Sequence, residues 1–114
     1  MERWLDRVHL PSALFCTDFN SVTVLMSLLS QRGIRVPDDI SLVGFDDPPA
    51  AILFNPPITT VHFSVKELGR RAFNRLLTEA DRDIPIGTDL LPVQLVERGS
   101  TAAPHAEHPE HVSS

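Results

Sequence analysis

IRVPDDISLVGFDDPPAAILFNPPITTVHFSVKELGRRAFNRLL, residues 34–77, is the stretch that decides the fold. Its nearly continuous apolar run, 40–45, has the length of a β-strand and is typical of a strand covered by helices on both faces. Two proline pairs come next, and residues 58–61 predict another short strand. Ser64 and Glu67 then have the spacing of a helix-capping box with one apolar stripe behind them. The stripe consists of Val65, Leu68, Ala72, Phe73, Leu76 and Leu77.

The flanking segments continue this alternation of strands and helices. Residues 12–16 form a short apolar run that predicts a strand, and the apolar residues of 22–29 have helical spacing. Gly33 suits the left-handed position just past a helix end. Residues 90–96 predict a last strand, in which Pro92 would suit a sheet edge. The pattern predicts an α/β fold with a parallel-type sheet, helices packed on it and right-handed crossovers.

The length of 114 residues allows one compact folding unit and is too short for two domains of ordinary size. We expect a loose segment over residues 1–10 and the folding unit over 11–98. Residues 99–114 are small, polar or proline in large part, so we expect a disordered tail there.

Composition excludes several classes of function. A net charge of −5 argues against DNA binding by this chain alone, because lysine and arginine supply most sequence-independent affinity for phosphates. Cys16 is the only cysteine, which favours a reducing compartment. The polar first ten residues do not resemble a signal peptide, and no apolar run approaches the roughly 20 residues that span a membrane. These features predict a cytoplasmic protein without a membrane segment.

Polar and aromatic residues follow the predicted strands. They are Asp18, Asp46 with Asp47, and His62 with Phe63. In open α/β sheets, ligands bind beyond the carboxyl ends of the strands, where carboxylates can accept hydrogen bonds from hydroxyls and a ring can cover an apolar face. Each residue also has a structural alternative: Asp18 as a helix N-cap, Asp47 as a turn residue and Phe63 as a core aromatic.

Four motifs occur in order along the chain. They are VPDDIS at 36–41, VGFDD at 43–47, PPITTV at 56–61 and LG at 68–69. At these spacings they resemble the C-terminal part of the effector-binding domain of LacI/GalR transcriptional regulators. LVERGST at 95–101 resembles that family's closing strand. The resemblance runs from Pro11 to Thr101 and implies part of the C-terminal lobe of a periplasmic-binding-protein-like type I fold, with an effector bound between two lobes.

The resemblance also implies roles for individual residues. Asp46 occupies the position of the family's effector-contacting aspartate, Asp18 that of the Asn or Asp after the preceding strand, and Phe63 a further pocket position. The chain departs from the commonest pattern at Asp18-Phe19, where members often have Asn-Asp, and at Phe63, where many have Gln. The implied function is binding of a sugar or nucleoside-like effector, without a cofactor, by a repressor fragment that lacks the helix-turn-helix module.

A homodimer contact is predicted at Ile52, Leu53 and Phe54. These residues lie between two proline-marked turns, and the corresponding family segment lies at the subunit interface. The alternative is a local helix packed on its own sheet.

Other functional classes fit the sequence less well. An enzyme would need a nucleophile with a base, but Cys16 ends an apolar strand, and His9 and His62 have no partner visible in the sequence. A metal site is not predicted, since the histidines at 105, 108 and 111 lie in the expected tail. A periplasmic sugar-binding protein, which shares the implied fold, and a dimerisation fragment without ligand remain alternatives.

Overall fold

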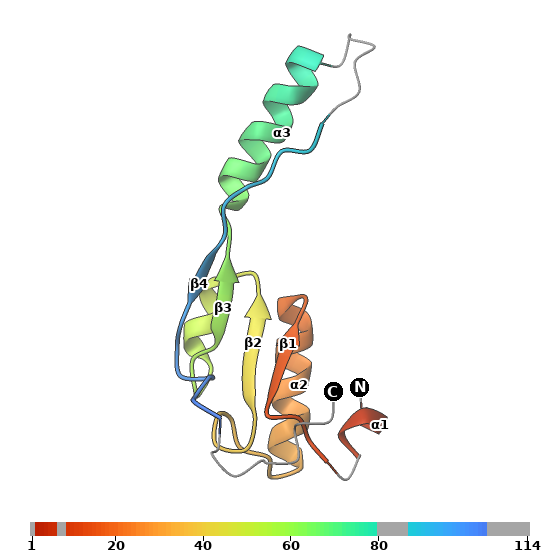
Figure 1. Ribbon diagram of the computed structural model, residues 1–114, viewed down its shortest axis with the longest axis vertical. Helices are drawn as coiled ribbons and strands as arrows, with labels where there is room; N and C mark the ends of the chain where they lie inside the picture. The colour runs from red at the N-terminus through yellow and green to blue at the C-terminus, as the bar shows by residue number, and fades with distance from the viewer. Residues whose placement is uncertain (1, 7–8, 80–86, 105–114) are drawn as a thin grey trace.

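The fold consists of a four-stranded sheet, one long helix that packs against it and a second long helix that extends away from the strand ends (Figure 1). The computed structural model describes residues 2–6, 9–79 and 87–104. Its strands are β1 (Ala13–Cys16), β2 (Ser41–Phe45), β3 (Thr59–His62) and β4 (Gln94–Val96). Its helices are α1 (Glu2–Leu5), α2 (Phe19–Gln31), α3 (Val65–Glu79) and the short 3₁₀ helix η1 (Pro49–Leu53).

The sheet is mostly parallel, as predicted. Its strand order is β1-β2-β3-β4. The first three strands are parallel, with Cys16 opposite Gly44 and Phe45 opposite Val61, whereas β4 runs antiparallel to β3 at the edge. The last strand begins at Gln94, later than expected, so Pro92 precedes it instead of lying within it. The carboxyl ends of the parallel strands β1, β2 and β3 therefore lie side by side along one edge of the sheet, the edge that runs across the strand ends.

Helix α2 forms the core with β1 and β2. Its buried face comprises Val22, Leu25, Leu28 and Leu29, and these side chains belong to one cluster with Ile40, Leu42, Ala51 and Ile58. A Cβ atom on Gly44 would lie only 2.8 Å from Cγ2 of Val22, so glycine is needed for the close approach of helix and strand. Gly33 has a φ of 68° just past the helix, which confirms the predicted left-handed position.

Helix α3 forms as predicted but does not pack on the sheet. The Glu67 amide donates to Ser64 Oγ at 3.1 Å, as expected of the capping residue. Figure 1 shows the helix extending away from the strand ends, and its apolar residues Val65, Leu68, Phe73, Leu76 and Leu77 are 46–67% exposed. The expectation that both helices cover the sheet is therefore wrong for α3. Helical periodicity identifies an apolar face and does not identify its partner.

Parts of the two terminal segments, 1–10 and 99–114, are more ordered than the sequence predicted. Leu5 is buried against the core cluster, although residues 1–10 were expected to be loose. Ser100 is fully buried: its carbonyl accepts from the Leu42 amide at 2.9 Å, and its Oγ accepts from the Thr59 amide at 2.8 Å. The predicted tail is thus wrong for 99–104, because hydroxyl hydrogen bonds anchor this segment where apolar burial is absent. Residues 105–114 lie outside the described part of the chain.

No helix in the described ranges combines the length and the apolar character needed to cross a membrane.

Candidate functional site

The predicted ligand residues follow β1, β2 and β3 at their shared edge. Asp46 is tied to β3 by its amide, which donates to the Val61 carbonyl at 3.0 Å. Phe63, after β3, stacks on Phe45, the last residue of β2, with ring centroids 5.4 Å apart and planes inclined by 25°. The structure therefore brings Asp46 and Phe63 to the ends of two adjacent strands.

Asp18 acts as the N-cap of α2. Its backbone is extended, with φ −150° and ψ 158°, and its Oδ1 accepts from the Ser21 amide at 2.8 Å. Its Oδ2 accepts from Ser21 Oγ, also at 2.8 Å. The hydrogen bond from the Ser21 amide is the main reason that the pKa of this carboxyl lies below its ordinary value. The capping alternative is thus confirmed, and both carboxylate oxygens have a structural partner.

Asp46 has an unusual backbone conformation. Its φ is 81°, in the left-handed region that few residues other than glycine adopt. Its Oδ1 accepts from the Asp47 amide at 2.8 Å, and the residue as a whole is half-buried. Short polar side chains such as aspartate tolerate this conformation because they can bond to the local backbone in this way. A turn at the end of β2 therefore presents a carboxylate at the sheet edge.

Asp47 forms an ion pair with Arg98. The guanidinium binds both oxygens, with Nη1 2.8 Å from Oδ1 and Nη2 3.1 Å from Oδ2, and the two side chains are only 15% and 18% exposed. The Arg98 hydrogen bond holds the pKa of Asp47 below its ordinary value. A role for Arg98 was not visible in the sequence, because 51 residues separate the partners and only the fold shows that they meet. The one available signal was the position of Arg98 in the closing motif.

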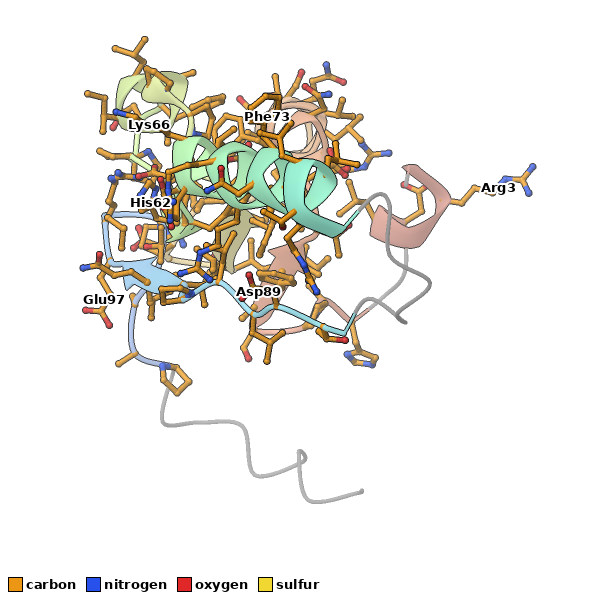
Figure 2. The ribbon with its side chains drawn as sticks, turned by 90° about the horizontal axis from the view of Figure 1, so that it is seen from above. Arg3, His62, Lys66, Phe73, Asp89 and Glu97 are labelled. Carbon is orange, nitrogen blue, oxygen red and sulfur yellow. The ribbon has the colours of Figure 1, made fainter. Side chains whose placement is uncertain are left out.

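His62, the last residue of β3, and Phe63, directly after it, complete this end of the sheet. Figure 2, seen from above, shows His62 beside the first turn of α3. Its side chain is 47% exposed, and its Nδ1 lies 3.9 Å from Asp47 Oδ2. Phe63 is half-buried against Phe45 and does not belong to the core cluster around α2. The stacked phenylalanines form an apolar surface next to the Asp46 turn.

The predicted dimer residues fall into two groups. Ile52 and Leu53 on η1 are 61% and 80% exposed, as a contact surface requires. Phe54 instead packs edge-on against Phe19, with ring centroids 5.7 Å apart, and lies against the core. Phe54 is thus half-buried by local packing, and Ile52 and Leu53 supply most of the exposed apolar surface of this segment.

Two other groups in the sequence have structural roles. Burial raises the pKa of the Cys16 thiol, with a smaller contribution from Asp18, which makes the thiol a poor nucleophile. On α3, Arg70 and Arg71 pair with Glu67, and Arg71 also pairs with Asp89 at 3.0 Å.

Within the described ranges no group of three potential metal ligands comes together. The histidines at 105, 108 and 111 lie outside those ranges.

A family model for a periplasmic binding protein-like domain matches residues 1–101. The chain belongs to this family. Within it, the chain is a LacI/GalR-type effector-binding domain in part: the transcriptional repressor PurR of Haemophilus influenzae (strain PittEE) is 44% identical over 77 residues. This match covers 68% of the chain and 23% of PurR. The chain thus spans about a quarter of the curated relatives that it matches.

Solved structures agree with this membership. The lac repressor dimer bound to operator and the anti-inducer ONPF superposes with a TM-score of 0.80 and 32% identity, over 90% of this chain and 36% of that one. A LacI-type transcription regulator from Bifidobacterium animalis subsp. lactis gives a TM-score of 0.78 at 32% identity, over 90% and 37% of the two chains. The family and partial α/β lobe expected from the motifs are therefore confirmed.

Proposed function

We propose that this chain forms one wall of the effector-binding site of a LacI/GalR-type transcriptional repressor that acts in the cytoplasm, by binding and not by catalysis. The observation that carries the proposal is the turn at Asp46. It places a half-buried carboxylate at the carboxyl end of β2, beside the stacked rings of Phe45 and Phe63. Ligands of open α/β sheets bind at such strand ends.

The chemistry of this edge favours a sugar or nucleoside-like effector. A carboxylate accepts hydrogen bonds from neighbouring hydroxyls, and each such charge-assisted bond contributes about 1.5 to 3 kcal/mol. An aromatic ring packs against the apolar face of a sugar or the plane of a base. Asp46 is therefore the proposed anchor and Phe63 the proposed stacking surface, with His62 at the margin. Asp18 is a weaker candidate because Ser21 engages both of its oxygens.

We infer that the rest of the site is formed by parts of such a repressor outside these 114 residues. The chain matches little more than a third of the lac repressor chain, and α3 carries a long exposed apolar face away from the sheet. We infer that α3 packs against the remainder of such a two-lobed protein, so the isolated chain binds effector weakly. DNA contacts would also come from the remainder, given the net charge of −5 here.

A homodimer contact at η1 belongs to the same proposal. Leu53 is 80% exposed, so Leu53→Asp should lower the mass measured by sedimentation while the far-UV circular dichroism spectrum stays the same. Phe54→Asp is unsuitable as a test, because Phe54 packs on Phe19 and its loss would destabilise the fold. An unchanged mass for Leu53→Asp would rule out this contact.

The effector site is tested by calorimetry on a chimaera in which residues 11–101 replace the matching part of the Haemophilus influenzae PurR. Glucose, galactose, ribose, adenosine and guanosine serve as probes. A probe that binds should lose at least about tenfold in affinity with Asp46→Ala, which removes the anchor. Asp38→Ala is the control, because this carboxylate is 68% exposed in the turn before β2, at the opposite edge of the sheet. Equal affinity in both variants would remove Asp46 from the site.

A further inference from the structure

Arg98 connects the segment after β4 to the turn that follows β2. Its guanidinium holds the Asp47 carboxylate through two bonds, and its Nη1 also donates to the Ile58 carbonyl at 2.8 Å and to Thr60 Oγ1 at 3.3 Å. Bidentate pairing of this kind fixes orientation as well as distance, because the planar guanidinium matches the carboxylate. One side chain thus joins the segment after β4 and the start of β3 to the Asp47 turn.

The backbone that carries Arg98 is itself fixed. Its amide donates to Thr59 Oγ1 at 2.9 Å, and its carbonyl accepts from the same hydroxyl at 3.2 Å. Two residues later, the buried Ser100 bonds to β2 and β3, and Thr101 Oγ1 lies 2.8 Å from Thr59 Oγ1. Because its backbone is fixed in this way, Arg98 can hold the Asp47 carboxylate in one position. An arginine on a mobile segment would only neutralise the charge of Asp47.

The residue next to the pair is the one in the left-handed conformation. Asp46 has a φ of 81°, and the amide of Asp47 donates to Asp46 Oδ1, so the orientation of one residue determines that of the other. Left-handed backbone at a residue with a side chain persists only where the surroundings hold it in place. The Asp47–Arg98 pair, 15% and 18% exposed, lies beside Asp46 and supplies such a restraint.

We propose that Arg98 is a positioning residue of the effector site: by clamping Asp47, it holds Asp46 in the left-handed conformation that presents its carboxylate beyond the strand ends. The role as part of a site rests on the proposed function. Arg98 does not itself contact the effector. It sets the geometry of the residue that does, and a site held in advance binds more tightly than one that must be ordered on binding.

Amide hydrogen exchange on the whole chain tests this proposal without any ligand. The Asp46 amide bonds to the Val61 carbonyl, so its exchange rate reports whether the turn stays in place. Arg98→Met should raise this rate at least about tenfold, while amides in the middle of α2 change much less. Arg98→Lys, which keeps the charge but cannot bind in bidentate fashion, should give an intermediate rate. Asp47→Asn, a milder change, should also raise the Asp46 rate.

Arg35→Met is the matched control. Arg35 binds Asp39 through two bonds of 3.1 Å in the turn before β2, at the opposite edge of the sheet. Its loss should leave the Asp46 rate unchanged. A uniform rise at all amides in Arg98→Met, or no rise at Asp46, would overturn the positioning role. Loss or retention of probe binding in Asp46→Ala bears on the proposed function alone, so the two ideas fail independently.

Discussion

Asp46 shows how much of the site can be predicted at the scale of a residue. Its place after an apolar strand was visible in the sequence, and so was the aromatic residue Phe63 after the next strand. Its φ of 81° and its dependence on Asp47 were not, because they follow from contacts with residues 98–101 at the other end of the chain. For Asp18 the structure confirms the local alternative, since N-capping requires only neighbours three residues away.

The ion pair at Asp47 predicts a specific pH dependence. Arg98 lowers the pKa of Asp47 in the folded protein below the ordinary 3.8, so the pair stabilises the fold above that value. This contribution is lost as the pH falls through the lower folded pKa. Asp47→Asn should therefore be less stable than wild type at neutral pH, and the difference should shrink on acidification. Urea unfolding across this range measures it, and a difference that grows with acid would contradict the assignment.

The buried hydroxyl of Ser100 should contribute to the free energy of unfolding. Its Oγ accepts from the Thr59 amide and donates to the Leu42 carbonyl, and the residue is fully buried. Ser100→Ala leaves both backbone groups without this partner, so it should lower the free energy of unfolding by about 2 kcal/mol. Ser30→Ala on the exposed face of α2 serves as the control. If both variants unfold alike in urea, the segment after β4 is not part of the folded unit.

At the scale of elements, the sequence predicted each major strand and helix, but it did not predict what each of them packs against. Strand and helix periods are local, so β1, β2, β3, α2 and α3 could be placed to within a few residues. The position of α3 depends on what its apolar face packs against, and that information is not in its own 3.6-residue period. The segment 99–104 was misassigned for the converse reason, because hydroxyl groups that bond to distant strands look the same in sequence as those of a disordered tail.

The apolar face of α3 predicts self-association of the isolated chain. Phe73 and Leu77 are 61% and 67% exposed, and contiguous apolar surface of this kind recruits a partner. Replacing both by lysine should lower the mass seen by sedimentation, whereas Asn74→Lys, on the same helix, should leave it unchanged. A monodisperse wild-type monomer with a cooperative thermal transition would contradict this prediction.

At the scale of the whole molecule, the chain carries a folded core and an exposed helix on one polypeptide. The four strands with α2 bury a single cluster, and β1 to β3 present their carboxyl ends at one edge. Family membership was predictable because it rests on four ordered motifs and not on one. The identity of the proposed effector was not predictable, since the proposed site lies between two lobes and the chain spans only about a quarter of the curated relatives that it matches.

The most direct test of the proposed effector site is effector-dependent operator binding by the PurR chimaera that carries residues 11–101. The measurement is a mobility-shift titration of operator DNA with and without the probe that binds in calorimetry. We predict that the probe changes operator affinity by about five- to 150-fold, the usual range of such coupling, and that Asp46→Ala abolishes this change while operator affinity without probe stays the same. A response to the probe that is equal in wild type and Asp46→Ala would contradict the assignment of this sheet edge as the effector site.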